Sequence, residues 1–482
     1  MQFNSYIFIF LFLPITLILY FITNKYNKNL GKILLIAVSI IFYIYEDIKN
    51  IYVLGASLII NYIFARIIEK KKTNKLTVTI PIVINIFILL YFKYTNFLII
   101  NINNIFNSNL ALKEILLPVG ISFFTFQQIA YIIAVQKKEI NKISLIEYLI
   151  YILYFPKLLM GPLMEPNDFL SQVNDNELKK VDWNNIAYGI KTFSYGLFKK
   201  IILADTFAKA VSWGFLNIAD ATSMDMIIVM LSYTFEIYFD FSGYSDMAVG
   251  TSLMFNIKLP INFDSPYKAL SIRDFWKRWH ISLTKFLTKY IYIPLGGSRK
   301  GLVFTCINTM IVFLVSGIWH GANWTFILWG LLHGLLSVID RLTEKKTNNL
   351  FEPFKWIFTF IIINILWLLF RANSVSEWLG ILHKILSFGN TSISIGLIDS
   401  FAIPEIFALT NLIPLFSKIY CSIRGFDMIL FIVSSFIICM LPKNNYKTKE
   451  KITFANMFLA SFCFVWSVTC LSAESVFVYF NF

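Results

Sequence analysis

Charged residues are scarce in this chain, and their scarcity excludes an ordinary soluble protein. Only 15% of the 482 residues are Asp, Glu, Lys or Arg, whereas 57% are hydrophobic, and the mean hydropathy is +0.67. A soluble protein of this length cannot bury so much apolar surface, so the excess must face lipid. No polar stretch is long enough to form a second folded domain. The composition therefore predicts a polytopic membrane protein.

Cysteine pairs and catalytic motifs are also missing. The chain has five cysteines and four histidines, without a CxxC pair, and the histidines lie far apart in the sequence. Neither a disulfide framework nor a zinc site is indicated. The nucleotide-binding and hydrolase motifs GxGxxG, GxxxxGK(S/T), GxSxG and HExxH do not occur. We therefore expect no metal and no resident cofactor, and any chemistry must come from a site that these motifs do not describe.

The basic residues indicate how the chain crosses a membrane. The net charge of +14 comes from Lys and Arg in short loops between apolar runs. The positive-inside rule produces this distribution, which argues against nucleic acid as a partner. Lysine-rich loops at 23–32, 66–75 and 137–142 alternate with connections at 46–50 and 94–114 that are poorer in lysine. We expect a multi-pass protein of the cell membrane with its N-terminus outside the cytoplasm.

Apolar runs predict an all-α membrane protein with about eleven transmembrane helices, some of them broken, tilted or re-entrant. We expect one membrane-embedded domain over residues 1–482, with further spans in 355–482. No internal repeat is visible, which argues against a transporter built from inverted repeats. The runs lie at 6–22, 33–45, 51–65, 77–93, 115–135, 144–160, 186–215, 224–239, 302–319, 324–339, 355–370, 427–441 and 454–471.

Residues 272–290, "IRDFWKRWHISLTKFLTKY", alternate aromatic and cationic side chains at helical spacing. The apolar residues cover an arc of about 120°. The segment therefore predicts one amphipathic helix at the cytoplasmic membrane surface. Arg273 and Lys277, with Arg299 in the following "YIPLGGSRKG", can bind either lipid headgroups or a phosphate-bearing acyl donor. His280 is expected at the edge of the same arc.

His320, in "SGIWHGANW" (316–324), is the sharpest catalytic candidate. It ends an apolar run of roughly spanning length, where an ionisable residue indicates function. Desolvation favours the neutral imidazole, which is the form that a general base requires. The alternative is a histidine bonded to a carbonyl at a helix end, with Trp319 and Trp324 as interfacial aromatic residues.

The neighbours of this histidine have expected supporting roles. If the helix continues past the histidine, Asn323 and Ser316 share its face and either orients the ring. Trp319 is expected to support the site from the adjacent position. Gly317 and Gly321 remove side-chain bulk, so that a substrate can approach closely.

Two other groups of polar residues are expected to have structural roles. His333 should not share a face with the preceding histidine and is expected to be a packed residue with a hydrogen-bond partner. Glu236, Asp240 and Asp246 are expected to form internal ion pairs with cations from 272–300.

Several of these stretches resemble the membrane-bound O-acyltransferase family, and within it the bacterial alginate O-acetylation branch. The agreement runs over most of the chain and is densest over about 117–340. The motifs are "LPVGISFFTFQQIAYI" (117–132), "FPKLLMGPLMEPNDF" (155–169), "GLFKKIILAD" (196–205), "FEIYFDFSGYSDMAVG" (235–250), "NFDSPY" (262–267), "RDFWKRWHISLTKFLTKYIYIPLGG" (273–297), "GIWHGANWTFILWGLLHG" (317–334) and "FVYFNF" (477–482).

The resemblance implies a multi-helix membrane enzyme with a funnel into the bilayer. The key histidine of the family matches His320, and its upstream histidine matches His280. The resemblance also implies transfer of an acyl group, expected to be acetyl. The donor is expected in the cytoplasm, such as acetyl-CoA or an acyl carrier, and the acceptor is a hydroxyl outside the cytoplasm. The expected partners are membrane lipids, an extracytoplasmic acyltransferase or acceptor protein, and a polysaccharide.

Other functions stay open at this stage. "YIPLGG" favours the alginate-like branch over the branch that D-alanylates teichoic acid, while peptidoglycan O-acetylation is a further alternative. From other classes, a transporter of an acyl carrier or glycan, or a subunit that anchors a soluble transferase, would have the same composition.

Overall fold

The structure is a computed structural model of the full chain. It describes residues 1–45, 47–70, 75–140, 144–347, 350–403, 405, 420, 423, 425–442, 444, 446, 453–471 and 477. Lys71 and Lys72 of the second basic loop, and residues 478–482 of the C-terminal motif, lie outside this set. The described residues form helices and loops without a strand, which confirms the predicted all-α class.

The chain folds into two compact units. The first contains Met1–Leu197, Tyr244–Ile261 and Lys449–Ser472, and the second contains Phe198–Gly243, Asn262–Thr448 and Ala473–Phe482. One helix, α11 (Ser223–Met254), contributes residues to both units. The expectation of a single domain over 1–482 stays a prediction.

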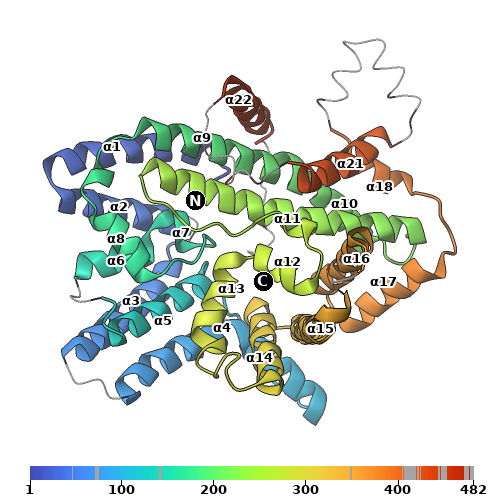
Figure 1. Ribbon diagram of the computed structural model, residues 1–482, viewed down its shortest axis with the longest axis horizontal. Helices are drawn as coiled ribbons and strands as arrows, with labels where there is room; N and C mark the ends of the chain where they lie inside the picture. The colour runs from blue at the N-terminus through green and yellow to red at the C-terminus, as the bar shows by residue number, and fades with distance from the viewer. Residues whose placement is uncertain are drawn as a thin grey trace. The chain divides into compact units, whose positions relative to one another are not determined.

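The first unit pairs long apolar helices with short ones (Figure 1). Within it, α1 packs on α2, α3 and α4 pack on α5, and α6 packs on α2. Its helices are α1 (Leu13–Tyr26, after a π-helical turn at Phe8–Phe12), α2 (Lys28–Ile44), α3 (Asn50–Lys70), α4 (Lys75–Phe106), α5 (Ile121–Gln136), α6 (Leu145–Leu153), α7 (Phe155–Leu158), α8 (Pro166–Asn174), α9 (Trp183–Phe198) and α22 (Phe454–Thr469).

The second unit contains the histidine motifs. Within it, α14 packs on α15, α15 packs on α16, and α12 packs on α15 (Figure 1). Its helices are the π-helical Lys199–Ala204, α10 (Asp205–Leu216), α12 (Ile272–Arg278), α13 (Ile281–Leu287), the π-helical Thr288–Tyr292, α14 (Leu302–His320), α15 (Trp324–Thr347), α16 (Glu352–Arg371), α17 (Val375–Ser387), α18 (Ile395–Asp399) and α21 (Phe426–Met440).

The described helices include enough apolar spans for a multi-pass membrane protein. Six are long and apolar enough to cross a bilayer, and further apolar helices are shorter. The predicted total of about eleven spans stays a prediction. The six are Phe8–Tyr26, Asn50–Lys70, Lys75–Phe106, Leu302–His320, Trp324–Thr347 and Glu352–Arg371, and the shorter ones are Asn29–Ile44, Ile121–Gln136, Phe426–Met440 and Phe454–Thr469.

Glycines set the close approach of α14 and α15. A Cβ atom on Gly330 would lie 2.5 Å from the carbonyl oxygen of Phe313, and one on Gly317 would lie 3.1 Å from the Cα of Gly330 and overlap the carbonyl of Phe326. These distances leave no room for a side chain at either glycine. The two backbones therefore meet at Gly317 and Gly330, which fixes the position of the C-terminal end of α14.

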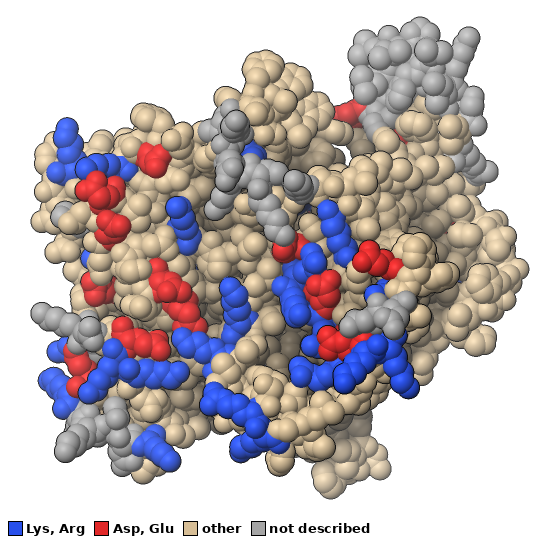
Figure 2. Space-filling view, viewed as in Figure 1, with Lys and Arg blue, Asp and Glu red and all other residues tan. Residues whose placement is uncertain are grey.

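The amphipathic segment is not the single helix that its pattern predicts. The helix stops at Arg278 and begins again at Ile281, because His280 adopts a left-handed conformation with φ of 44°. Such a conformation is uncommon for a residue other than glycine and persists only where the surroundings enforce it. In Figure 2, Lys and Arg side chains gather over α12 and α15 with a few acids among them, as the predicted cationic face requires.

Candidate active site

His320 is the last residue of α14 and lies in an aromatic cage. The helix ends there because Gly321 is extended, with φ of −166°. The imidazole is 4% exposed, and its centroid lies 4.9 Å from that of Trp319 and 5.2 Å from those of Trp329 and Phe370. Aromatic rings of α14, α15 and α16 therefore exclude bulk water from this histidine.

His280 lies in the same cluster, although the helical pattern placed it at the edge of an exposed face. It is 1% exposed, with its ring 4.7 Å from Phe241 and 6.3 Å from Trp319. Trp319 thus neighbours both histidines. Burial lowers the pKa of His280 to about 3, so the ring is neutral at physiological pH. Neither of its ring nitrogens has a hydrogen-bond partner among the described residues.

Asn323, an expected neighbour of His320, has other contacts, because α14 does not continue beyond the histidine. The Nδ2 of Asn323 donates to the carbonyl of Asn373 at 2.9 Å, and its Oδ1 accepts the backbone N–H of Thr325 at 3.1 Å. Asn323 therefore caps the start of α15 instead of lying one turn beyond the imidazole on one helix.

The glycines of the motif do not provide open space for a substrate. The backbone of α15 occupies the space beside Gly317, and the ring of Phe326 occupies the space beside Gly321. The expected substrate approach at these two positions is therefore wrong. Of the two tryptophans, Trp319 is buried within the cluster, whereas Trp324 is 56% exposed.

A pocket of about 290 Å³ lies among α12, α13, α14 and α15. It unites two of the three cations expected at the donor, Arg273 and Lys277, with Ser316, which lies one helical turn before His320. Arg299 is exposed and does not line it. The lining residues are Arg273, Trp276, Lys277, Leu283, Thr284, Leu287, Thr288, Tyr292, Thr309, Val312, Phe313, Ser316, Ser337 and Arg341.

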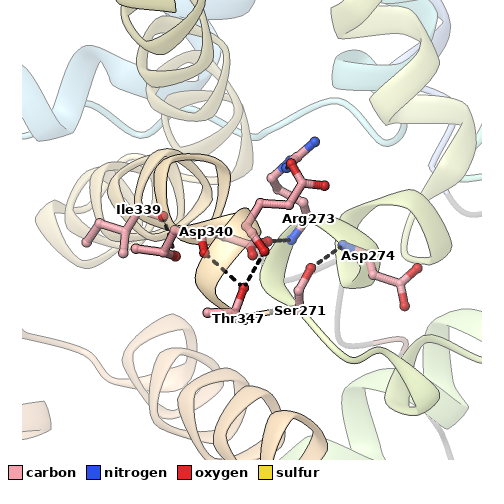
Figure 3. Close-up of polar contacts among 8 residues, drawn as sticks. Ser271, Arg273, Asp274, Ile339, Asp340 and Thr347 are labelled. Atoms are coloured by element: carbon pink, nitrogen blue, oxygen red, sulfur yellow. Dashed lines mark hydrogen bonds and ion pairs between the residues drawn. The ribbon is translucent and has the colours of Figure 1, made fainter. Parts of the chain in front are cut away.

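Acidic residues of α15 hold Arg273 at this pocket, as Figure 3 shows. The backbone N–H of Arg273 donates to Asp340 at 2.9 Å, and its guanidinium forms an ion pair with Glu344 at 2.9 Å. Ser271 caps the same helix by accepting the N–H of Asp274. The carboxylate of Asp340 at the start of α12 is also favourable for the helix dipole. Two acids spaced by four residues in "DRLTE" are the sequence signal for this anchor, which the sequence analysis missed.

The pocket wall continues into the aromatic cluster. Trp276 lines the pocket, and its centroid lies 5.5 Å from that of Trp329, which contacts His320. His333 belongs to this cluster, although its rotation from His320 on one continuous helix predicts that the two lie apart. The break at Gly321 places them on separate helices, and both rings contact Trp329.

Asp240 of the acidic motif forms its ion pair with a lysine outside 272–300, the segment predicted to supply the cation. Asp240 accepts from the buried Lys200 at 2.7 Å, and Lys200 also pairs with Asp205 at 2.9 Å. The expectation of internal ion pairing is confirmed for Asp240. Its partner comes from the π-helical turn at Lys199–Ala204, not from 272–300, so that part of the expectation is wrong.

Together, two buried histidines and a largely apolar pocket with cationic residues form the candidate site of this protein. The model of the membrane-bound O-acyltransferase family matches residues 72–372, and the chain belongs to this family. It is therefore an enzyme of the O-acyltransferase class in a family of membrane proteins.

Named relatives place the chain within the family. It is 36% identical to the peptidoglycan O-acetyltransferase of Helicobacter pylori, over 100% of this chain and 97% of that protein. It is 37% identical to the probable alginate O-acetylase of Pseudomonas putida, over 82% of each chain. The teichoic acid D-alanyltransferase of Streptococcus thermophilus is 32% identical over 48% of this chain and 59% of its own. The resemblance to the family and to its alginate O-acetylase branch is confirmed.

Proposed function

We propose that this enzyme transfers an acetyl group from a cytoplasmic thioester, such as acetyl-CoA or an acyl carrier, to hydroxyls of an extracytoplasmic polysaccharide. The pocket carries this proposal. Arg273, Lys277 and Arg341 suit the phosphates of the donor, and the apolar walls suit its less polar arm. Ser316 lines the same pocket one turn from His320, where the acyl carbonyl would react.

The proposed reaction uses His320 as the general base. The acceptor hydroxyl loses its proton to the imidazole as its oxygen attacks the thioester carbonyl. The new C–O bond forms, the C–S bond breaks, and the proton passes from the imidazolium to the departing thiolate. The aromatic cage supports this role, because it excludes bulk water from the imidazole. His280, which burial holds neutral, is the second catalytic candidate.

The alignments favour one class of acceptor for the first test. The peptidoglycan O-acetyltransferase aligns with the whole chain, whereas the probable alginate O-acetylase aligns with 82% and the D-alanyltransferase with 48%. We propose a cell-envelope glycan, with peptidoglycan examined before alginate-like polymers. D-alanyl transfer to teichoic acid is the lesser alternative, whereas membership of an O-acyltransferase family argues against a transporter or an anchoring subunit. An extracytoplasmic partner protein is part of the proposal, and the cell membrane with an outside N-terminus is the proposed location.

The donor role of the pocket is tested in inverted membrane vesicles with radiolabelled acetyl-CoA. A charge-assisted contact contributes about 1.5–3 kcal/mol, and 1.4 kcal/mol corresponds to about tenfold in affinity. Lys277→Gln and Arg341→Gln should therefore each raise the KM for acetyl-CoA about tenfold. Lys285→Gln is the matched control, because Lys285 is an exposed cation on α13 that does not line the pocket. An unchanged KM in both pocket variants would refute the donor role.

The acceptor is identified by measuring ester-linked acetyl groups on purified peptidoglycan and on secreted polysaccharide. Cells that carry the wild-type protein are compared with cells that carry His320→Ala at an equal protein level. Loss of acetyl from one polymer identifies the acceptor. Loss of ester-linked D-alanine, with acetyl unchanged, would replace the proposed reaction by the teichoic acid alternative.

A further inference from the structure

His333 is a buried histidine that the proposed reaction does not use. It lies on α15, is 1% exposed, and its Nδ1 accepts the indole N–H of Trp276 at 3.1 Å. The two rings meet edge to face, with centroids 5.0 Å apart and an interplanar angle of 89°. Burial of a polar ring is unfavourable without a hydrogen-bond partner, and the indole of Trp276 is that partner for His333.

The hydrogen bond determines the chemical form of His333. Since Nδ1 accepts a hydrogen bond from the indole N–H, it cannot carry a proton, and the ring carries its proton on Nε2. That Nε2 has no hydrogen-bond partner among the described residues. His333 therefore acts as an acceptor for Trp276, and nothing in the described structure places it to accept a proton from a substrate.

Trp276 connects His333 to both parts of the site. The indole lines the donor pocket, and its centroid lies 5.3 Å from that of Phe313 of α14, which also lines it. The indole also meets Trp329, which contacts His320. The orientation of this indole therefore shapes the pocket wall, whereas it reaches His320 only indirectly, through Trp329. An indole can rotate about two side-chain bonds, and the hydrogen bond to His333 selects one orientation.

We propose that His333 is a positioning residue of the donor site, which holds Trp276 as a fixed wall of the pocket through the Nδ1 hydrogen bond. This rests on the proposed donor role of the pocket. Without the acceptor, the indole N–H is buried without a partner, and the ring turns to find one. The pocket then fits the donor poorly, while the chemistry at His320 is unchanged.

The test compares three substitutions in inverted vesicles with radiolabelled acetyl-CoA. His333→Leu removes the acceptor and should raise the KM for acetyl-CoA about tenfold, with kcat within about twofold of wild type. His333→Asn places an amide oxygen near the position of Nδ1 and should restore most of the affinity. In the Trp276→Phe background, which has no indole N–H, adding His333→Leu should change the KM by less than about twofold. His383→Asn is the matched control, because His383 is exposed on α17.

Each other outcome contradicts the proposal in a distinct way. Equal losses of kcat in His333→Leu and His333→Asn, with an unchanged KM, would make His333 a proton-transfer group. A lower amount of folded protein with an unchanged KM would make its role purely structural. If Lys277→Gln raises the KM and His333→Leu does not, the positioning role fails while the donor pocket stands. If neither variant changes the KM, the proposed donor pocket itself is wrong.

Discussion

The buried His280 should make the stability of the protein depend on pH. The perturbation is acidification from about pH 7.5 to about pH 5. Burial lowers the pKa of this imidazole in the folded protein to about 3, whereas an exposed histidine in the unfolded chain has a pKa of about 6.5. Below about pH 6.5 the unfolded chain therefore binds a proton that the folded protein does not bind. Acid must then favour unfolding.

The magnitude follows from the two pKa values. Each pH unit between them costs about 1.4 kcal/mol of unfolding free energy, so acidification from about pH 6.5 to about pH 5 removes about 2 kcal/mol. Above about pH 6.5 the ring is neutral in both states and contributes no pH dependence. His280 lies between α12 and α13, outside the candidate membrane spans, so the aqueous reference value applies to the unfolded segment.

The assay is unfolding of the purified protein in lipid nanodiscs at both pH values. His280→Asn removes the titrating ring, and asparagine tolerates the left-handed backbone at φ of 44°. This variant should lose about 2 kcal/mol less than the wild type on acidification. His383→Asn, at an exposed position, should behave like the wild type. Equal acid sensitivity in wild type and His280→Asn would show that the imidazole is not desolvated, and the reasoning would be wrong.

Three further results are expected. His320→Ala should reduce acyl transfer about 10²–10⁴-fold at an unchanged protein level, because a general base contributes a factor of this size; near wild-type transfer would remove its catalytic assignment. Gly317→Ala should lower the unfolding free energy by about 1–3 kcal/mol, because its methyl group would overlap the backbone of α15; unchanged thermal unfolding would contradict that contact. Cysteines introduced at 28 and 72 should resist an impermeant thiol reagent in intact cells while one at 105 reacts, and the reverse pattern would invert the proposed topology.

Sequence alone was sufficient for the class of the protein and for the residues worth testing. Low charge and long apolar runs predict lipid-facing helices whatever their packing, because hydrophobic surface must leave water. His280 and His320 stand out in the sequence because each is a lone ionisable ring in an apolar or amphipathic segment, where such a residue indicates function. Arg273 and Lys277 follow from their place on the cationic side of a helical pattern.

Tertiary structure decided what these residues contact. Helical periodicity assumes an unbroken backbone, and two breaks, at His280 and at Gly321, overturn it. The first break buries a histidine that periodicity places at the edge of an exposed face. The second break places His320 and His333 on separate helices, and both rings contact Trp329.

The distant partners of residues in α15 could not be assigned from the sequence for a related reason. Arg341 at the pocket, Asp340 and Glu344 at Arg273, and His333 at Trp276 all act across a gap of more than fifty residues. Local propensity predicts the conformation of a segment, but it does not predict which distant segment packs against it. Here the contact depends on Gly317 and Gly330, where the absence of two side chains lets α14 and α15 touch, and both helices line the pocket.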